Sequence, residues 1–165
     1  MSNWKKKQNV LWLVVAVFYL LFLFNYVAYA QSTLPVSAEV SANAKSLVEA
    51  HVKAQVNYDR ASLARLTHSQ YFEISPVGEF DTHEKMLGFY DSPRNAPGPE
   101  VSVQEWEVRQ FGANVSASAK LQFKMRIGEQ TREFAIRATY QLCDEAGQTK
   151  ICSAHYTPIV AKRGA

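Results

Sequence analysis

The sequence predicts an α+β domain in which three helices precede a curled antiparallel sheet. Two patterns support this fold class. Apolar residues between positions 40 and 58 recur at three- and four-residue spacing, which is typical of an amphipathic helix, whereas from Val101 onward they recur at every second residue, which is typical of half-buried strands. The residues from Gln31 to Ala165 are enough for one hydrophobic core, so a single domain is expected.

The first 30 residues have the layout of a secretory signal peptide. Three lysines at positions 5–7 precede an uninterrupted apolar run from Val10 to Phe24, and Ala28-Tyr29-Ala30 suits a signal peptidase cleft. We therefore expect cleavage after residue 30 and export to the periplasm or the cell exterior. The alternative is an uncleaved membrane anchor, because residues 10–30 match the length of about 20 residues that a membrane-spanning helix needs. In both cases we expect the domain to lie outside the cytoplasm, and a membrane would be contacted only through the N-terminal segment if it stays uncleaved.

Charge and composition exclude several partner classes. The formal net charge of +3 comes from the three leader lysines, so the rest of the chain is formally neutral and offers no basic surface for nucleic acid. The two cysteines and four histidines do not follow the spacing of a metal site. We expect no bound metal and no cofactor.

The predicted helices follow from apolar spacing and cap chemistry. A Ser/Ala-rich tether over residues 31–43 leads into a domain spanning residues 44–160, and residues 161–165 form a C-terminal tail. Asp59 and Ser62 offer caps for a short second helix, and Asp81 with Glu84 resembles a capping box that starts a third helix. The stripe of the long first helix consists of Val40, Ala44, Leu47, His51, Ala54 and Tyr58.

Strands occupy the remaining periodic segments. The first is Tyr71 to Ile74, which stops before the turn at residues 75–78, and the stretch 91–100 must be a loop because it contains three prolines and a glycine. Alternating apolar residues then predict strands at 115–127, 134–142 and 151–159.

The two cysteines lie on the last two predicted strands. A two-residue turn at Gly147-Gln148 would place Cys143 opposite Cys152, at a Cα separation of about 4.5 Å that lies within the disulfide range. In an oxidising compartment we expect a cross-strand disulfide, with free thiols as the alternative.

Three segments carry a resemblance to a known family. They are the helix end at Tyr58-Asp59, the string from Tyr71 to Glu79 (YFEISPVGE) and the terminal His155 to Ile159 (HYTPI). Together they resemble the SnoaL-like, nuclear transport factor 2-like superfamily, and in particular its branch of small domains of unassigned function. The resemblance covers about Ala44 to Ile159. It implies a cone-shaped domain whose curved antiparallel sheet wraps the long helix, with a pocket at the open end and frequent dimerisation through the sheet.

Enzymes of this superfamily, such as ketosteroid isomerases, place acid/base groups inside the cone. Against the isomerase pattern, the tyrosine that donates to the oxyanion falls on His51, the proton-shuttling aspartate falls on Ser75, and a third donor falls near Thr139. None of the three groups is retained. We therefore expect an accessory or small-molecule-binding module without catalysis. The alternative is an isomerase, lyase or hydrolase in which His51 and Ser75 act as a couple.

Six residues are candidates for contacting a small apolar ligand. Tyr58 is expected to belong to the core or to the pocket wall. His51 could instead be a polar residue packed within the helix stripe. Ser75 could instead cap the turn before Pro76. Arg137 and Thr139 share one strand face, and the predicted register places Tyr156 opposite Thr139. This polar face lies either at the mouth of the pocket or on the solvated side of the sheet. In the second case it is where a homodimer would form. The candidates are His51, Tyr58, Ser75, Arg137, Thr139 and Tyr156.

Overall fold

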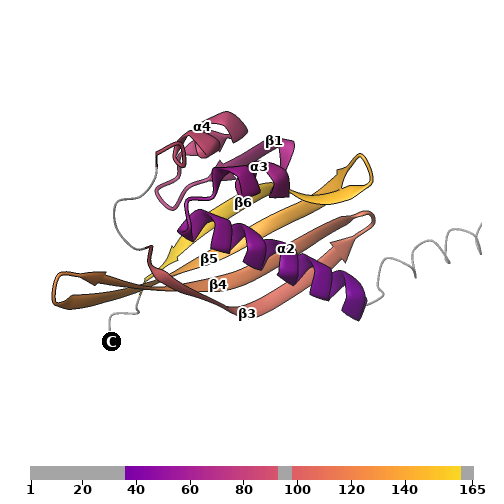
Figure 1. Cartoon of the computed structure of the whole chain (residues 1–165). Coiled ribbons are helices and arrows are strands. Elements are labelled where there is room, and N and C mark those ends of the chain that lie inside the picture. Colours follow the sequence, from indigo (N-terminus) through magenta and orange to yellow (C-terminus); the bar gives the residue numbers. More distant parts are fainter. Residues whose placement is uncertain (1–35, 93–97, 161–165) are drawn as a thin grey trace, which may run out of the picture. The chain divides into compact units, whose positions relative to one another are not determined.

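The computed structural model describes residues 36–92 and 98–160, so the predicted signal peptide, the first five residues of the predicted tether (31–35) and the C-terminal tail lie outside the described residues. Three helices and six strands form the domain (Figure 1). Within this range no helix is long and apolar enough to span a membrane. In chain order the elements are α2 (Ala38–Val56), α3 (Arg60–Leu66), β1 (Thr67–Ile74), β2 (Phe80–Thr82), α4 (His83–Gly88), β3 (Glu100–Phe111), β4 (Asn114–Ile127), β5 (Gln130–Glu145) and β6 (Gln148–Ile159).

The strands form one sheet in the order β2-β1-β6-β5-β4-β3, and α2 lies across one face of it (Figure 1). The α+β class is confirmed, with one correction. The sheet is mixed, because β1 and β6 pair in parallel while the other neighbours are antiparallel. The last strand of the meander, β6, lies beside β1, which follows the first two helices, and both run in the same direction.

The long helix forms as its apolar stripe predicts and begins earlier than expected. The Ser37 Oγ accepts a hydrogen bond from the Val40 N–H (3.2 Å), and Glu39 lies in the first turn, so the helix starts at Ala38 and takes up part of the segment expected to be a tether. Its buried face packs on small and branched residues of β4 and β5. The core there comprises Ala44, Val48, Val52, Ala117, Leu121 and Ala138, each at most 2% exposed.

The start of the third helix differs from the sequence expectation. The cap is Thr82, whose Oγ1 accepts from the Lys85 N–H (3.3 Å), whereas Asp81 belongs to β2 and is only 1% exposed. Asp81 pairs with Glu73 of β1 in the sheet, and its carboxylate contacts the Lys85 ammonium at 2.6 Å. The capping-box prediction was wrong because strand pairing takes Asp81 out of the helix start. The Asp59 cap of α3 is confirmed, since its carboxylate accepts from the Ser62 N–H at 2.9 Å.

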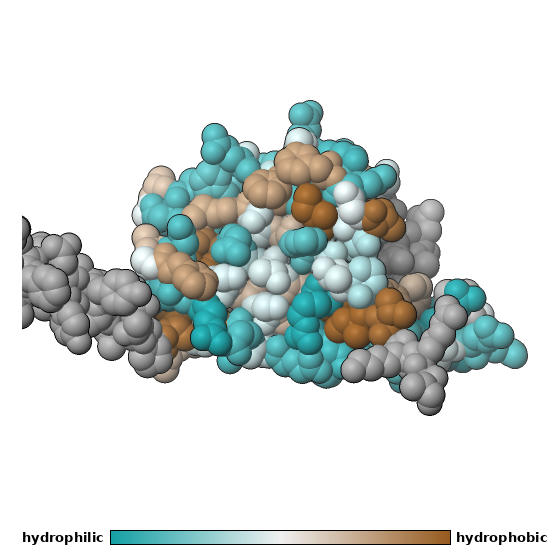
Figure 2. All heavy atoms as spheres, turned by 180° about the vertical axis from the view of Figure 1, so that it is seen from behind, coloured by the Kyte–Doolittle hydropathy of each residue, from teal (hydrophilic) through white to brown (hydrophobic). Residues whose placement is uncertain are grey.

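The two faces of the sheet differ in polarity. On β4 and β5 the residues that face α2 are buried, and the residues between them, on the outer face, are largely polar. Figure 2 shows the molecule from the side opposite to Figure 1, where white and teal side chains occupy the middle and brown groups lie around them. This outer face is separate from the core.

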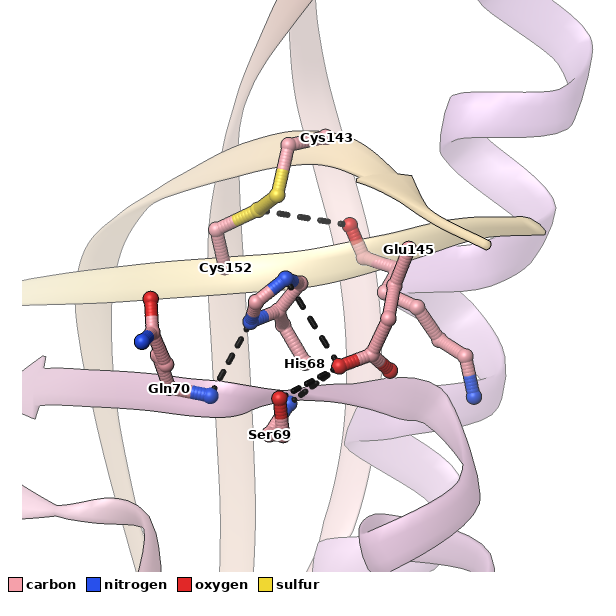
Figure 3. The surroundings of a disulfide bond; sticks show 7 residues. His68, Ser69, Gln70, Cys143, Glu145 and Cys152 are labelled. Carbon is pink, nitrogen blue, oxygen red and sulfur yellow. Dashed lines mark hydrogen bonds and ion pairs between the residues drawn. A yellow bond between two sulfur atoms is a disulfide. The ribbon is translucent and has the colours of Figure 1, made fainter. Parts of the chain in front are cut away.

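The predicted disulfide between Cys143 and Cys152 is present, although its register differs from the prediction (Figure 3). The hairpin turns at Ala146 and Gly147, which both have positive φ (53° and 81°), so Cys143 pairs with Lys150. A bulge at residue 152 shifts the following register, and the two cysteine Cα atoms lie 6.0 Å apart.

The bulge also changes the partners farther along β6. Tyr156 pairs with Ala138, and Thr139 pairs with His155, so the predicted Thr139–Tyr156 pair does not form. The tip of the hairpin is held against the start of β1 as well. The Glu145 carboxylate accepts from the N–H and the hydroxyl of Ser69 (2.9 and 2.5 Å), as Figure 3 shows.

Candidate ligand-binding pocket

A cavity of about 270 Å³ lies beside the C-terminal end of α2, close to the lower limit of about 300 Å³ for small-molecule sites. Its walls come from α2, β1, β4, β5, β6 and the segments that follow α2 and α4. The polar and aromatic lining consists of Gln55, Tyr58, Glu73, Tyr90 and Tyr156. The apolar lining consists of Val56, Pro76, Pro99, Leu121, Phe123 and Ile136.

Strand alternation on β1 brings the main polar group to this cavity. Tyr71 and Glu73 both point toward the core, and they are 2% and 7% exposed, because every second residue of a strand faces the same side. The Tyr71 hydroxyl donates a hydrogen bond of 2.6 Å to the Glu73 carboxylate. On the neighbouring strand, the Tyr156 hydroxyl accepts from the Gln55 amide at 3.2 Å.

The Glu73 carboxyl lies in an environment that opposes its negative charge. Burial raises its pKa, the hydrogen bond from Tyr71 acts in the opposite direction, and the Asp81 carboxylate on the paired strand raises it further. The nearby Lys85 ammonium contacts Asp81 and, at 3.8 Å, Glu79. Among residues 36–92 and 98–160, no lysine, arginine or histidine forms an ion pair with Glu73. Glu73 is therefore a buried acid whose side-chain hydrogen bond within the described ranges comes from a neutral hydroxyl, that of Tyr71.

Tyrosine rings surround this acid. Tyr58 and Tyr90 contact edge to face, with centroids 5.3 Å apart, and Tyr140 and Tyr156 do so at 6.1 Å. Burial raises the pKa of Tyr90, Tyr140 and Tyr156 above the usual range, so their hydroxyls stay neutral at physiological pH. The pocket thus offers aromatic rings and neutral hydroxyl groups next to one carboxyl group.

Tyr58 occupies an unusual backbone conformation at the rim. It follows the C-cap Asn57 with φ of 55°, in the left-handed region where glycine is the common residue after a helix. A bulky residue there carries strain, and such strain is concentrated at functional sites in known proteins. The aromatic side chain is kept at the pocket despite that cost.

His51 and Ser75 are not brought together. His51 is fully buried between the rings of Tyr71 and Tyr140 (centroids 6.2 and 5.8 Å), and neither of its ring nitrogens has a hydrogen-bond partner in the described part of the chain. Burial lowers the pKa of His51 to about 4. Ser75 lies in the turn after β1, where its hydroxyl accepts from the Glu79 N–H at 3.1 Å. Neither residue is among the described lining of the pocket, so the geometry offers no couple between them.

Arg137 and Thr139 lie on the outer face of the sheet, away from the pocket. Their neighbours Ala138 and Tyr140 are buried toward α2, so strand alternation turns Arg137 and Thr139 to the other side. Arg137 forms an ion pair with Glu105, and the Thr139 hydroxyl donates to the Ser118 hydroxyl at 3.4 Å. Of the six candidates, Tyr58 and Tyr156 line the pocket.

Sequence reasoning missed Glu73, Gln55 and Tyr90. Glu73 stands in the string that carries the family resemblance, two residues after Tyr71, and strand alternation alone would have placed both on the same face. Gln55 lies in the last turn of α2, one residue after the buried Ala54. Tyr90 reaches the pocket through the turn after α4, and no periodicity marks that position.

A second hollow of about 540 Å³ lies between α2 and β3 and shares Val56 and Pro99 with the first. Its charged lining residues are Glu49, Lys53 and Glu100, all of which are exposed. It contains no buried polar group, so the pocket beside Glu73 is the better candidate for a specific ligand.

Comparisons with known proteins identify the fold. No family model and no curated protein matches this chain. Among solved structures, an NTF2-like protein from Cytophaga hutchinsonii is similar with a TM-score of 0.62 and 22% identity, over 75% of this chain and 100% of that chain. An NTF2-like protein of unknown function from Pseudomonas putida has a TM-score of 0.64 and 12% identity, over 78% of this chain and 92% of that chain.

A CaMKII hub from S. rosetta is similar to the same extent, with a TM-score of 0.64 and 12% identity over 76% of this chain and 100% of that chain. The chain has the NTF2-like fold, as the sequence resemblance implied. At these identities the likeness concerns the fold alone.

Proposed function

We propose that this NTF2-like domain binds a small, largely apolar organic molecule in the pocket beside Glu73. One observation carries the proposal: a carboxyl group that is 7% exposed faces a cavity with apolar and aromatic walls, and no ion pair within the described ranges explains its burial. Burying a charge without a partner is costly, so such a group is expected where a ligand or a reaction uses it.

A thermal-shift screen tests this proposal directly. The chain, purified from an exporting host, is screened against small aromatic and alicyclic compounds of each charge type. A compound that binds only the folded state at 100 times its dissociation constant adds about 2.7 kcal/mol of stability. Hits should disappear when Leu121 in the pocket wall is replaced by Trp, while Val77→Trp at an exposed turn position is the matched control (1% and 82% exposed). Absence of hits across the library would contradict the proposal.

The proposal includes export of the domain. The Cys143–Cys152 disulfide supports it, because disulfides persist in oxidising compartments and are rare in the cytosol. The mass of the chain recovered from the periplasm or medium would distinguish cleavage after Ala30 from retention of an uncleaved anchor. Recovery only from the cytosol would contradict export.

Self-association through the outer face of the sheet is a second proposal. Phe72 and Phe80 stack there with centroids 5.2 Å apart while remaining 40% and 57% exposed. Exposed paired aromatic rings are typical of contact surfaces. Light scattering should show a dimer that Phe80→Asp dissociates, whereas Phe111→Asp, an exposed position at the far edge strand, leaves it intact. A monomer at all concentrations would contradict the proposal.

A further inference from the structure

Among the described residues that line the pocket, the only charged side chain is acidic. Glu73 is this acidic residue, and no lysine, arginine or histidine is among the lining residues that the structure describes. Asp81 adds a second carboxylate next to Glu73 across the β1–β2 pair, and the Lys85 ammonium that balances it belongs to a half-exposed side chain (48%) in contact with Asp81. Among the residues that the structure describes, none places a fixed positive charge on the cavity side of Glu73.

The aromatic lining favours the same kind of ligand. Tyr58, Tyr90, Tyr156 and Phe123 all contribute to the walls of the cavity. Aromatic faces attract cations through the quadrupole of the ring, and cages of such rings are a common means of binding ammonium groups. The strained backbone of Tyr58 and its edge-to-face contact with Tyr90 hold two of these rings in place.

We propose that the ligand is an organic cation, a protonated amine or quaternary ammonium compound with a hydrocarbon body. The nitrogen lies beside the Glu73 carboxylate among the tyrosine rings, and the hydrocarbon body contacts Leu121 and Ile136. This inference rests on the proposed function and narrows it to one ligand class. A carboxylate ligand would meet the charges of both Glu73 and Asp81, which disfavours that class by electrostatic repulsion.

The electrostatics of Glu73 agree with this geometry. Burial and Asp81 both raise the pKa of Glu73, which means that they oppose its ionised form. A cation within about 4 Å would offset both effects and favour the carboxylate. The hydroxyls of Tyr71, Tyr90, Tyr140 and Tyr156 also lie around Glu73, and burial keeps them neutral.

Three probes of similar size and different charge test the inference: phenethylamine, 2-phenylethanol and phenylacetate. Binding is measured by titration calorimetry on the intact exported chain at pH 7.5. The amine should bind at least about tenfold more tightly than the alcohol, and the alcohol more tightly than the acid. Glu73→Gln should abolish the preference for the amine. Glu79→Gln removes the same charge at an exposed position (64%) outside the lining and should preserve it.

The outcomes separate this inference from the proposed function. Equal or tighter binding of the alcohol or the acid by the unmodified chain would refute the cation class while leaving the pocket as a binding site. An amine preference that survives in a folded Glu73→Gln variant would also refute it. If that variant does not fold, Tyr90→Leu provides the second test, because loss of the ring should weaken the amine more than the alcohol. No binding of any probe overturns the inference, and the wider screen then decides whether the pocket binds anything.

Discussion

His51 should make the stability of the domain fall on acidification. Its ring is fully buried, and burial lowers its pKa from 6.5 to about 4. Below pH 6.5 the unfolded chain binds a proton at this residue that the folded chain does not bind until about pH 4. The contribution is therefore fully present above pH 6.5 and is lost as the pH falls through this window, by about 1.4 kcal/mol for each pH unit and about 3 kcal/mol in total.

Replacing His51 by Leu isolates this effect. Leucine fills a similar volume between Tyr71 and Tyr140 and carries no polar atoms, whereas both His51 nitrogens lack hydrogen-bond partners in the described residues. Leaving a buried polar group unpaired costs about 1–3 kcal/mol, so the variant should match or exceed the unmodified chain in stability at pH 7.5. Its advantage should then grow by about 3 kcal/mol toward pH 4.

Urea denaturation between pH 7.5 and 4 measures the difference. His155→Gln is the matched control, because it removes a histidine that is exposed on β6 and leaves the core unchanged. His83 has a pKa that burial lowers, so His83→Gln is needed to remove its smaller contribution of the same sign. If the folded His51→Leu variant loses stability with pH as steeply as the unmodified chain, the reasoning is refuted.

Two further perturbations test the packing. Gly98→Ala should destabilise the domain by about 1–3 kcal/mol, since a Cβ there would lie 2.5 Å from the Val56 carbonyl oxygen. In the matched control Gly88→Ala the nearest atom is 3.9 Å away and the change should be under about 1 kcal/mol; equal effects in thermal denaturation would contradict the argument. Replacing both Cys143 and Cys152 by Ala should cost about 2–3 kcal/mol in urea denaturation, because the bond closes a loop with a sequence separation of 9. A double variant as stable as the oxidised chain would refute this estimate.

The helices show which structural features local sequence patterns predict and which they do not. The spacing of Ala44, His51 and Ala54 predicts the buried face of α2, and Asp59 caps α3 as its side-chain chemistry predicts. Asp81 has the same cap chemistry, yet it is buried in β2 opposite Glu73. The sequence around Asp81 fits both a helix cap and a short edge strand. Only the pairing of Asp81 with Glu73 in the folded sheet decides between the two.

The hairpin illustrates a different limit. The pairing of Cys143 with Cys152 was predicted correctly from a register that was wrong, because a bulge at Cys152 compensates for a turn that lies one residue earlier. The bulge then moves Tyr156 opposite Ala138. The register of a hairpin depends on the backbone angles of single turn residues such as Ala146, which has φ of 53°. The amino-acid sequence specifies these angles only weakly.

The pocket was the part least accessible to sequence. The family resemblance implies His51 and Ser75 as pocket residues, whereas the structure places Glu73 at the cavity and His51 in the core. The sequence is compatible with either face of the sheet for Arg137 and Thr139, and burial of Ala138 and Tyr140 assigns them to the outer face.

By itself the sequence determined the class of the domain, its helices, most of its strands and its disulfide pair. These depend on apolar periodicity and on residues near one another in the chain. Tertiary structure alone decided the parallel pairing of β1 with β6, the shifted register, and the meeting of Gln55, Glu73, Tyr90 and Tyr156 at one cavity. The physical reason is that contacts between distant segments depend on how the whole sheet pairs and bends around α2, and no local pattern specifies that arrangement.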